Sequence, residues 1–275
     1  MIRLVALDID DTLTADGLTV SSRVIAAVHN AQHNGIQVVL ATGRMFQSAC
    51  NFAYLLGLEG PLICYHGALI RSLLTGETWY EKVISPRLGR QALALLRQES
   101  VDVLANFGDD LYCERITPAI ERYVSIANVP LIPTVDFWSR HITQKGPIKI
   151  VFVAPPGQVG KVLERLRLAF GERLGLFETS SVLGELIPAG VDKASALRRL
   201  ARHLGIPARE VMAVGDGSSD ARMIRWAGVG VAMGNASEEL KALADLVTGR
   251  VEEDGVAQVL ETRLALSCQR VFGKL

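Results

Sequence analysis

The chain has 275 residues, with 29 basic and 29 acidic side chains and 49% hydrophobic residues. This length fits one large domain or two modest ones, and the composition excludes disordered and collagen-like chains. A formal net charge of zero gives the whole molecule no field that would attract nucleic acid or an anionic membrane. We therefore expect neither as a partner.

The sequence shows no segment typical of secretion or membrane insertion. The apolar start at residues 2–7 is followed by Asp8, Asp10 and Asp11, which would interrupt a signal peptide, and the most apolar runs are only strand-sized. The four cysteines have no C-x-x-C spacing, so they predict reduced thiols rather than a zinc site or a disulfide scaffold. We expect a cytoplasmic protein.

The N-terminal elements predict a β-α-β unit. Residues 2–7 are an apolar run typical of a buried strand, and a turn region follows over residues 11–19. The next helix has Ser21 or Ser22 as its N-cap, apolar residues at helical spacing, and Gly35 at its end. Residues 36–41 then predict a second strand that lies parallel to the first.

The same alternation returns late in the chain, with helices expected over 192–203 and 220–226 and strands over 211–214 and 229–232. The two ends of the chain therefore predict one α/β domain with a doubly wound, mainly parallel sheet. The middle predicts an inserted α+β domain, with strands over 79–84, 101–106, 111–114, 148–153, 174–178 and 183–187 and helices over 87–99, 118–127 and 157–170. We place the insert at residues 84–187, so that residues 1–83 and 188–275 form the first domain.

Polar residues follow three of the expected parallel strands, at residues 8–12, 42–44 and 215–220. Ligands bind at the carboxyl ends of the strands in an open parallel sheet, so these segments are expected to meet. They would bring three or more carboxylates together, which is unstable without a cation. Mg²⁺, a hard ion that prefers oxygen ligands, is the expected partner.

Each of these signals has an ordinary interpretation when it is taken alone. Asp8 or Asp216 could be a helix cap or a turn residue, and Lys193 in the first turn of a helix could be a solvated charge. A lysine there faces the positive end of the helix dipole, which is a small reason to expect an anionic partner. The functional hypothesis depends on the signals occurring together.

Four segments in order resemble the motifs of haloacid dehalogenase-superfamily phosphatases: residues 8–13 (DIDDTL), 41–44 (ATGR), 190–197 (GVDKASAL) and 215–223 (GDGSSDARM). Residues 232–236 (AMGNA) and 252–257 (EEDGVA) resemble the tail of the Cof-type branch. In that branch, the long stretch between the second and third motifs carries an α/β cap domain. The resemblance spans the whole chain and implies the same doubly wound core with an inserted cap.

The resemblance also implies a role for each motif residue. Asp8 would be the nucleophile that forms an aspartyl-phosphate, and Asp10 the general acid and base. Mg²⁺ would be held by the Asp8 carboxylate, the Asp10 backbone carbonyl and Asp216, with Asp220 orienting these ligands. The phosphoryl group would be bound by the Thr42 hydroxyl, the Gly43 N–H, Lys193 and the residue at position 219.

Two residues depart from the Cof-type pattern. Ser219 stands where the branch usually has asparagine, which puts one phosphate contact in doubt. His66 stands where the branch usually has asparagine before Gly67 and Ala68, and either contacts substrate or is a hydrogen-bonded structural residue near a strand end. Neither change affects the expected nucleophile.

We predict a Mg²⁺-dependent phosphatase of a small phosphorylated metabolite, with sugar phosphates as the expected class. The alternatives are a phosphotransferase or mutase that uses the same phosphoenzyme, and a non-catalytic sensor, against which Asp8 and Asp10 argue. No P-loop, dinucleotide-binding or serine-hydrolase motif competes with this interpretation. The sequence does not indicate the oligomeric state. Four residues of the insert are candidates for substrate contact, although ordinary surface positions are expected for them: Asn106, Arg115, Arg140 and Lys149.

Overall fold

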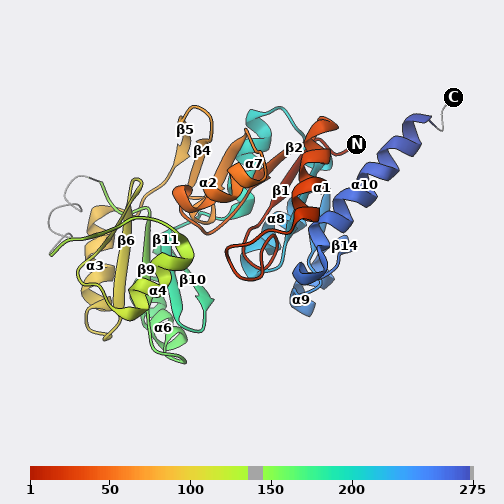
Figure 1. Cartoon of the computed structure of the whole chain (residues 1–275). Coiled ribbons are helices and arrows are strands. Elements are labelled where there is room, and N and C mark those ends of the chain that lie inside the picture. The colour runs from red at the N-terminus through yellow and green to blue at the C-terminus, as the bar shows by residue number, and fades with distance from the viewer. Residues whose placement is uncertain (136–144, 273–275) are drawn as a thin grey trace. The chain divides into compact units, whose positions relative to one another are not determined.

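The computed structural model describes residues 1–135 and 145–272, with side chains through residue 263. The chain divides into two units (Figure 1). Unit 1 consists of Met1–Trp79 and Asp192–Leu275, and unit 2 of Tyr80–Val191. The insert predicted at residues 84–187 falls inside unit 2, whose bounds are a few residues wider on each side.

Unit 1 is built on a parallel sheet with the strand order β14-β13-β12-β1-β2. Its strands are β1 (Leu4–Leu7), β2 (Gln37–Leu40), β12 (Val211–Gly215), β13 (Val229–Ala232) and β14 (Leu246–Val247). The first and last segments of the chain thus supply neighbouring strands, because β1 lies between β2 and β12. The predicted fold class, a doubly wound and mainly parallel sheet, is confirmed.

The first crossover helix shows how the sequence sets the ends of an element. The Ser21 hydroxyl accepts a hydrogen bond from the N–H of Val24 at 3.2 Å, so Ser21 rather than Ser22 is the N-cap. Gly35 follows the helix with a φ of 77°, a conformation that glycine adopts without strain. The helices of unit 1 are α1 (Ser22–His33), α2 (Phe46–Leu55), α7 (Lys193–His203), α8 (Ala221–Trp226), α9 (Glu238–Leu243) and α10 (Gly255–Phe272).

Helix α2 and two strands of a small sheet were not predicted, whereas the third strand of that sheet overlaps the strand expected over residues 79–84. The cap position of α2 is Met45, which makes no side-chain capping bond, and two of its four buried residues are alanines, so its sequence pattern is weak. The small sheet has the order β3-β4-β5, and Ile63 forms a parallel bridge to Ala41 beyond β2. Its strands are β3 (Pro61–Cys64), β4 (Leu69–Ser72) and β5 (Thr78–Glu81), with the short helix η1 (Tyr65–Gly67) between the first two.

Unit 2 contains a mostly antiparallel sheet with the order β10-β11-β9-β6-β7-β8, in which only β7 and β8 pair in parallel. Its strands are β6 (Asp102–Phe107), β7 (Asp110–Cys113), β8 (Leu131–Pro133), β9 (Lys149–Val153), β10 (Leu174–Ser180) and β11 (Leu183–Pro188). Its described helices are α3 (Pro86–Leu96), α4 (Pro118–Ala127) and α6 (Val159–Phe170). This is the α+β insert predicted from the sequence.

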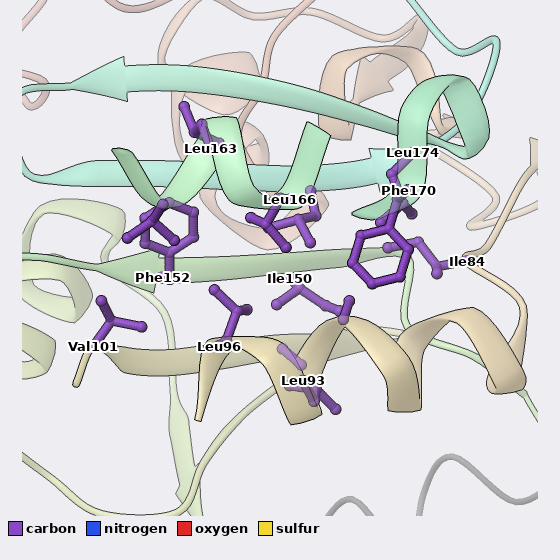
Figure 2. Close-up of a cluster of buried hydrophobic side chains, with 14 of the residues drawn as sticks. Ile84, Leu93, Leu96, Val101, Ile150, Phe152, Leu163, Leu166, Phe170 and Leu174 are labelled. Atoms are coloured by element: carbon purple, nitrogen blue, oxygen red, sulfur yellow. The ribbon is translucent and has the colours of Figure 1, made fainter. Parts of the chain in front are cut away.

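Helices α3 and α6 cover one face of this sheet (Figure 2). Leu96 of α3 and Leu166 of α6 are fully buried in one hydrophobic cluster with Ile150 and Phe152 of β9. Because side chains alternate along a strand, Lys149 and Val151 face the other side of the sheet. Burial of this apolar cluster stabilises unit 2.

Among the described residues, no helix combines the length and the apolar character that crossing a membrane requires. The structure describes the side chains of three cysteines, of which Cys64 and Cys113 are buried and Cys50 is half-buried.

Gly184 of β11 allows a test of this packing. A Cβ at this position would lie 2.1 Å from Cζ of Phe152, so Gly184→Ala should force the ring to move and destabilise unit 2 by about 1–3 kcal/mol. Gly160→Ala in α6 is the matched control, because its nearest neighbour is 3.8 Å away and alanine is favoured in helices. Urea denaturation should show a lower midpoint for the first variant only, and equal midpoints would contradict this account of the core.

Candidate active site

The register of the parallel sheet brings three loops to one edge of unit 1. Leu7, the last residue of β1, pairs with Val214 of β12 on one side and with Leu40 of β2 on the other. Asp8 continues from β1, with its N–H donating to the Val214 carbonyl at 3.1 Å. The segments that follow the three strands therefore begin side by side, as the sequence predicted.

Lys193 joins two carboxylates of these loops. Its Nζ lies 2.8 Å from Oδ1 of Asp8 and 2.7 Å from Oδ1 of Asp220, and its side chain is only 2% exposed. Lys193 is the first residue of α7, and the N-cap Asp192 accepts a hydrogen bond from the N–H of Ser195 at 2.5 Å, which fixes where the helix begins. The interpretation of Lys193 as a solvated surface charge is therefore wrong, because it is a buried counter-ion.

Asp220 organises the loop after β12. Its Oδ2 accepts hydrogen bonds from the backbone N–H groups of Asp216 at 3.2 Å and Gly217 at 3.0 Å, while Oδ1 faces Lys193. A Cβ on Gly215 would lie 2.5 Å from Cγ of Asp220, so this close approach requires glycine. Both oxygens of Asp220 are thus already engaged within the protein.

Asp8, Asp216 and Asp220 each place one carboxylate oxygen within 4.8 Å of the others. Asp216 is oriented by the Thr12 hydroxyl, which donates to its Oδ1 at 2.9 Å. Three carboxylates against the single ammonium of Lys193 leave an excess of negative charge in a buried place. An all-oxygen donor set with this charge fits a hard divalent cation such as Mg²⁺.

The pKa values of these groups reflect the same imbalance. Burial raises the pKa of Asp8 well above its ordinary value and the Asp220 carboxylate adds to the increase, while Lys193 opposes it. Burial and Asp220 raise the pKa of Asp216 to about 7. Burial lowers the pKa of Lys193, but the carboxylates of Asp220 and Asp8 outweigh that effect, so its pKa lies above the ordinary value. Bringing a cation to this site would favour ionisation of both carboxyl groups.

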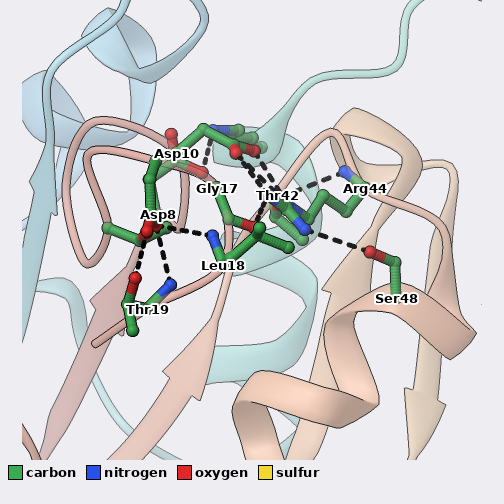
Figure 3. Close-up of polar contacts among 11 residues, drawn as sticks. Asp8, Asp10, Gly17, Leu18, Thr19, Thr42, Arg44 and Ser48 are labelled. Atoms are coloured by element: carbon green, nitrogen blue, oxygen red, sulfur yellow. Dashed lines mark hydrogen bonds and ion pairs between the residues drawn. The ribbon is translucent and has the colours of Figure 1, made fainter. Parts of the chain in front are cut away.

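Asp10 lies in a different environment, next to Arg44 (Figure 3). Its Oδ1 accepts a hydrogen bond from Nη2–H of Arg44 at 2.6 Å, and its Oδ2 accepts one from Nε–H at 3.0 Å. The side chain of Asp10 is 52% exposed, whereas that of Asp8 is 10% exposed. The two carboxylates of this motif therefore have opposite surroundings, one desolvated and one open to solvent.

Thr42 and Gly43 follow β2 and are held by the turn at His66. The Thr42 hydroxyl accepts a hydrogen bond from the N–H of Arg44 at 3.1 Å, and the N–H of His66 donates to the Thr42 carbonyl at 2.9 Å. A Cβ on Gly43 would lie 2.5 Å from the His66 imidazole, so a side chain at position 43 would displace this buried ring. His66 is 6% exposed and has a φ of 55°, and its backbone bond to Thr42 gives it a structural function; substrate contact by His66 stays a prediction.

Ser219 lies half-buried in the turn η4 (Ser218–Asp220), beside the carboxylate cluster. The residues predicted to be catalytic, to bind metal or to bind phosphate all lie near strand ends or helix starts of unit 1.

Three contacts of the site were not predicted. Arg44, which pairs with Asp10, and Thr12, which donates to Asp216, belong to the motifs, but no function was predicted for either of them. Asn235 of the tail motif donates from Nδ2 to the Asp11 carbonyl at 2.8 Å and accepts from the N–H of Val251 at 3.0 Å, so it joins the first motif to the tail. The position of these three residues within the motifs could have indicated that they matter. Their hydrogen-bond partners could not be predicted, because those depend on the fold.

The four residues of the insert named as candidates for substrate contact were expected at ordinary surface positions, and this expectation holds for only some of them. Arg115 is exposed and lies 3.4 Å from Asp102, as expected for a surface charge. The same expectation is wrong for Lys149 and Asn106, which are buried, and Lys149 forms an ion pair with Glu185 at 2.7 Å. Arg140 lies outside the described residues.

Comparisons with known proteins agree with the motifs. A family model described as haloacid dehalogenase-like hydrolase matches residues 5–260. Phosphatase YwpJ of Bacillus subtilis (strain 168) is 29% identical over 282 residues, which cover 94% of this chain and 99% of that protein. Phosphoglycolate phosphatase of Methanopyrus kandleri is 28% identical over 268 residues, which cover 96% and 98% of the two chains.

Solved structures show the same similarity. A haloacid dehalogenase-like hydrolase from Bacteroides thetaiotaomicron has a TM-score of 0.88 to this chain at 31% identity, with 95% of this chain and 99% of that chain covered. The similarity therefore extends over both units.

The pKa of Asp216 leads to a test by pH. Its folded-state pKa is about 7 against an ordinary value of 3.8, so the folded state holds this proton more tightly than the unfolded chain. The resulting stabilisation is complete below 3.8 and is lost as the pH rises through about 7. The metal-free wild-type protein should therefore lose stability as the pH rises over this range. Asp216→Asn, which cannot ionise, should lose less stability over the same range. Thermal unfolding in chelator measures the effect, with the exposed Asp109→Asn as control, and equal slopes for wild type and Asp216→Asn would contradict the assignment.

Proposed function

The chain belongs to the haloacid dehalogenase-like hydrolases, and within that family we propose that it is a Mg²⁺-dependent phosphatase that acts through an aspartyl-phosphate on Asp8. The prediction of a Cof-type phosphatase of this superfamily is confirmed. The observation that carries the finer proposal is the cluster of Asp8, Asp216 and Asp220 beside the Lys193 ammonium, in which Asp8 and Asp220 are buried and Asp216 is half-buried.

Asp8 is the nucleophile in this proposal. Lys193 bonds one oxygen of its carboxylate, which fixes the side chain and leaves the other oxygen for attack on phosphorus. Attack forms the bond between this oxygen and phosphorus as the ester bond to the leaving alkoxide breaks. Covalent catalysis divides one difficult displacement into two easier ones.

Asp10 is the general acid and base. It gives a proton to the leaving alkoxide in the first step and takes one from the attacking water in the second. Its exposed carboxyl can exchange this proton with solvent, which the buried Asp8 carboxyl cannot do as readily.

Mg²⁺ would be held by the Asp8 carboxylate, the Asp10 backbone carbonyl and Asp216. When bound, the ion would offset the negative charge of Asp8 and of the phosphate ester. Asp220, whose oxygens already bind Lys193 and two backbone N–H groups, would hold the Asp216 loop in place.

The phosphoryl oxygens would be bound by Lys193, Thr42 and the Gly43 N–H. An ammonium has three donors, and Lys193 uses two of them on Asp8 and Asp220, so one remains for phosphate. The Thr42 hydroxyl accepts from Arg44, which leaves its own proton to donate. Ser219 is a further donor in this proposal.

The substrate in this proposal is a small phosphorylated metabolite, with sugar phosphates as the first class to screen. Unit 2 would act as the cap domain that selects among phosphate esters, as the family resemblance implies. A cytoplasmic location stays a prediction from the sequence.

Asp8→Asn should abolish turnover, because an amide of the same shape is a poor nucleophile. We expect inorganic phosphate release from a panel of phosphorylated metabolites, with no acceptor present, to fall more than a hundredfold, or about 2.7 kcal/mol in the barrier. The exposed Asp109→Asn should be unaffected. Activity of Asp8→Asn within about tenfold of wild type would rule out the covalent mechanism.

Chelation should remove activity reversibly. EDTA should stop phosphate release and added Mg²⁺ should restore it, whereas Ca²⁺ should not, because its larger and looser coordination misplaces the nucleophile. Asp216→Asn should need a much higher Mg²⁺ concentration for half-maximal rate. Full activity in the presence of chelator would refute the metal site.

A further inference from the structure

We infer that Arg44 is a positioning residue, which holds the carboxyl group of Asp10 for proton transfer. The inference rests on the proposed function, because it concerns the acid and base of that mechanism. It gives a specific function to a motif residue for which the sequence predicted none.

The pairing of the two side chains has a fixed geometry. Nη2 of Arg44 lies 2.6 Å from Oδ1 of Asp10, and Nε lies 3.0 Å from Oδ2. A planar guanidinium that donates to both oxygens of a carboxylate sets its orientation as well as its position. One hydrogen bond from a flexible lysine would leave the carboxyl plane free to rotate.

Arg44 is itself anchored on the protein (Figure 3). Nη2 also donates to the Gly17 carbonyl at 2.8 Å, Nη1 donates to the Ser48 hydroxyl at 3.2 Å, and the guanidinium lies 4.7 Å from the centre of the Phe52 ring. The Arg44 side chain is 10% exposed, against 52% for Asp10. A cation that is fixed by the protein and largely shielded from solvent therefore pairs with a carboxylate that is itself half exposed.

The loop that supplies the Gly17 carbonyl is also ordered. Gly17 has a φ of 75° and follows Asp16. The Asp16 carboxylate accepts hydrogen bonds from several groups of the loop: the Thr14 hydroxyl at 2.7 Å, the Leu18 N–H at 2.8 Å, the Thr19 N–H at 2.7 Å and the Thr19 hydroxyl. Arg44 thus connects Asp10 to two ordered parts of unit 1, this loop and helix α2.

The hydrogen bonds of Arg44 favour positioning over direct binding of substrate. A guanidinium has five N–H donors. Arg44 commits four of them to protein atoms: Nε–H and one Nη2–H to Asp10, the other Nη2–H to Gly17, and one Nη1–H to Ser48. Arginine does not release its proton near neutral pH, so Arg44 can act on proton transfer only through Asp10.

The inference predicts an effect that depends on the leaving group. In the first step the Asp10 carboxyl proton passes to the leaving oxygen as the ester bond breaks. An alkyl phosphate needs this proton because an alkoxide is a poor leaving group, whereas p-nitrophenyl phosphate releases a stabilised phenolate and needs it much less. Because kcat/KM reports the steps up to departure of the leaving group, the ratio of kcat/KM for the two esters measures acid catalysis.

The test compares this ratio in wild type, Arg44→Gln, Asp10→Asn and the double variant, with Mg²⁺ present. We expect Arg44→Gln to lower the alkyl-to-aryl ratio at least about tenfold, and to change it less than about threefold in the Asp10→Asn background, because the two residues act as a unit. Arg44→Lys keeps the positive charge but loses the two-bond geometry of the guanidinium, so it should lower the ratio to an intermediate value. It also provides the test if Arg44→Gln does not fold, as judged by thermal unfolding.

Arg23→Gln is the matched control, because Arg23 forms a two-bond pair with Glu261 at 3.2 and 2.8 Å on the exposed surface of the same unit. It should leave the ratio unchanged. Equal losses on both esters in the Arg44 variants, or a loss of the ratio that persists in Asp10→Asn, would overturn the inference. Absence of phosphate release from either ester by wild type would instead refute the proposed function.

Discussion

The buried ammonium of Lys193 is the interaction on which the arrangement of the site depends. It pairs with Asp8 at 2.8 Å and with Asp220 at 2.7 Å, and all three side chains are nearly inaccessible to water. Loss of one partner from a buried ion pair costs about 3–5 kcal/mol, because a charge remains buried without compensation. The ends of β1, α7 and the loop after β12 are thereby held together, although they come from opposite ends of the chain.

The different surroundings of Asp8 and Asp10 suit the two functions proposed for them. Asp8 lies in a desolvated cluster whose charge a divalent ion would complete, which suits a nucleophile that must be ionised when metal and substrate are bound. Asp10 is half exposed to solvent and is paired with the Arg44 guanidinium. This position suits a group that must gain and lose a proton in each catalytic cycle. Two carboxylates that are close in sequence can be given separate functions by their environments alone.

The sequence predicted the parallel sheet and the meeting of its loops because those features follow from local patterns, while the functions of the loop residues stay predictions. Apolar runs ending at Asp8, Thr42 and Asp216 marked the carboxyl ends of three parallel strands, and the β1 register then placed them together. The Asp10–Arg44 pair, 34 residues apart, was beyond the same reasoning, because the direction of the arginine depends on Gly17, Ser48 and Phe52. Helix α2 was also missed, since it lacks a side-chain cap.

The central claim is that phosphate is carried on Asp8. The most direct measurement is rapid acid quench of the wild-type protein during turnover of a ³²P-labelled ester with Mg²⁺, followed by peptide mapping. Our account predicts transient label on the peptide that contains Asp8, with the hydroxylamine sensitivity of an acyl phosphate. Label on another residue, or single-turnover release of phosphate with no labelled protein at any time, would contradict it.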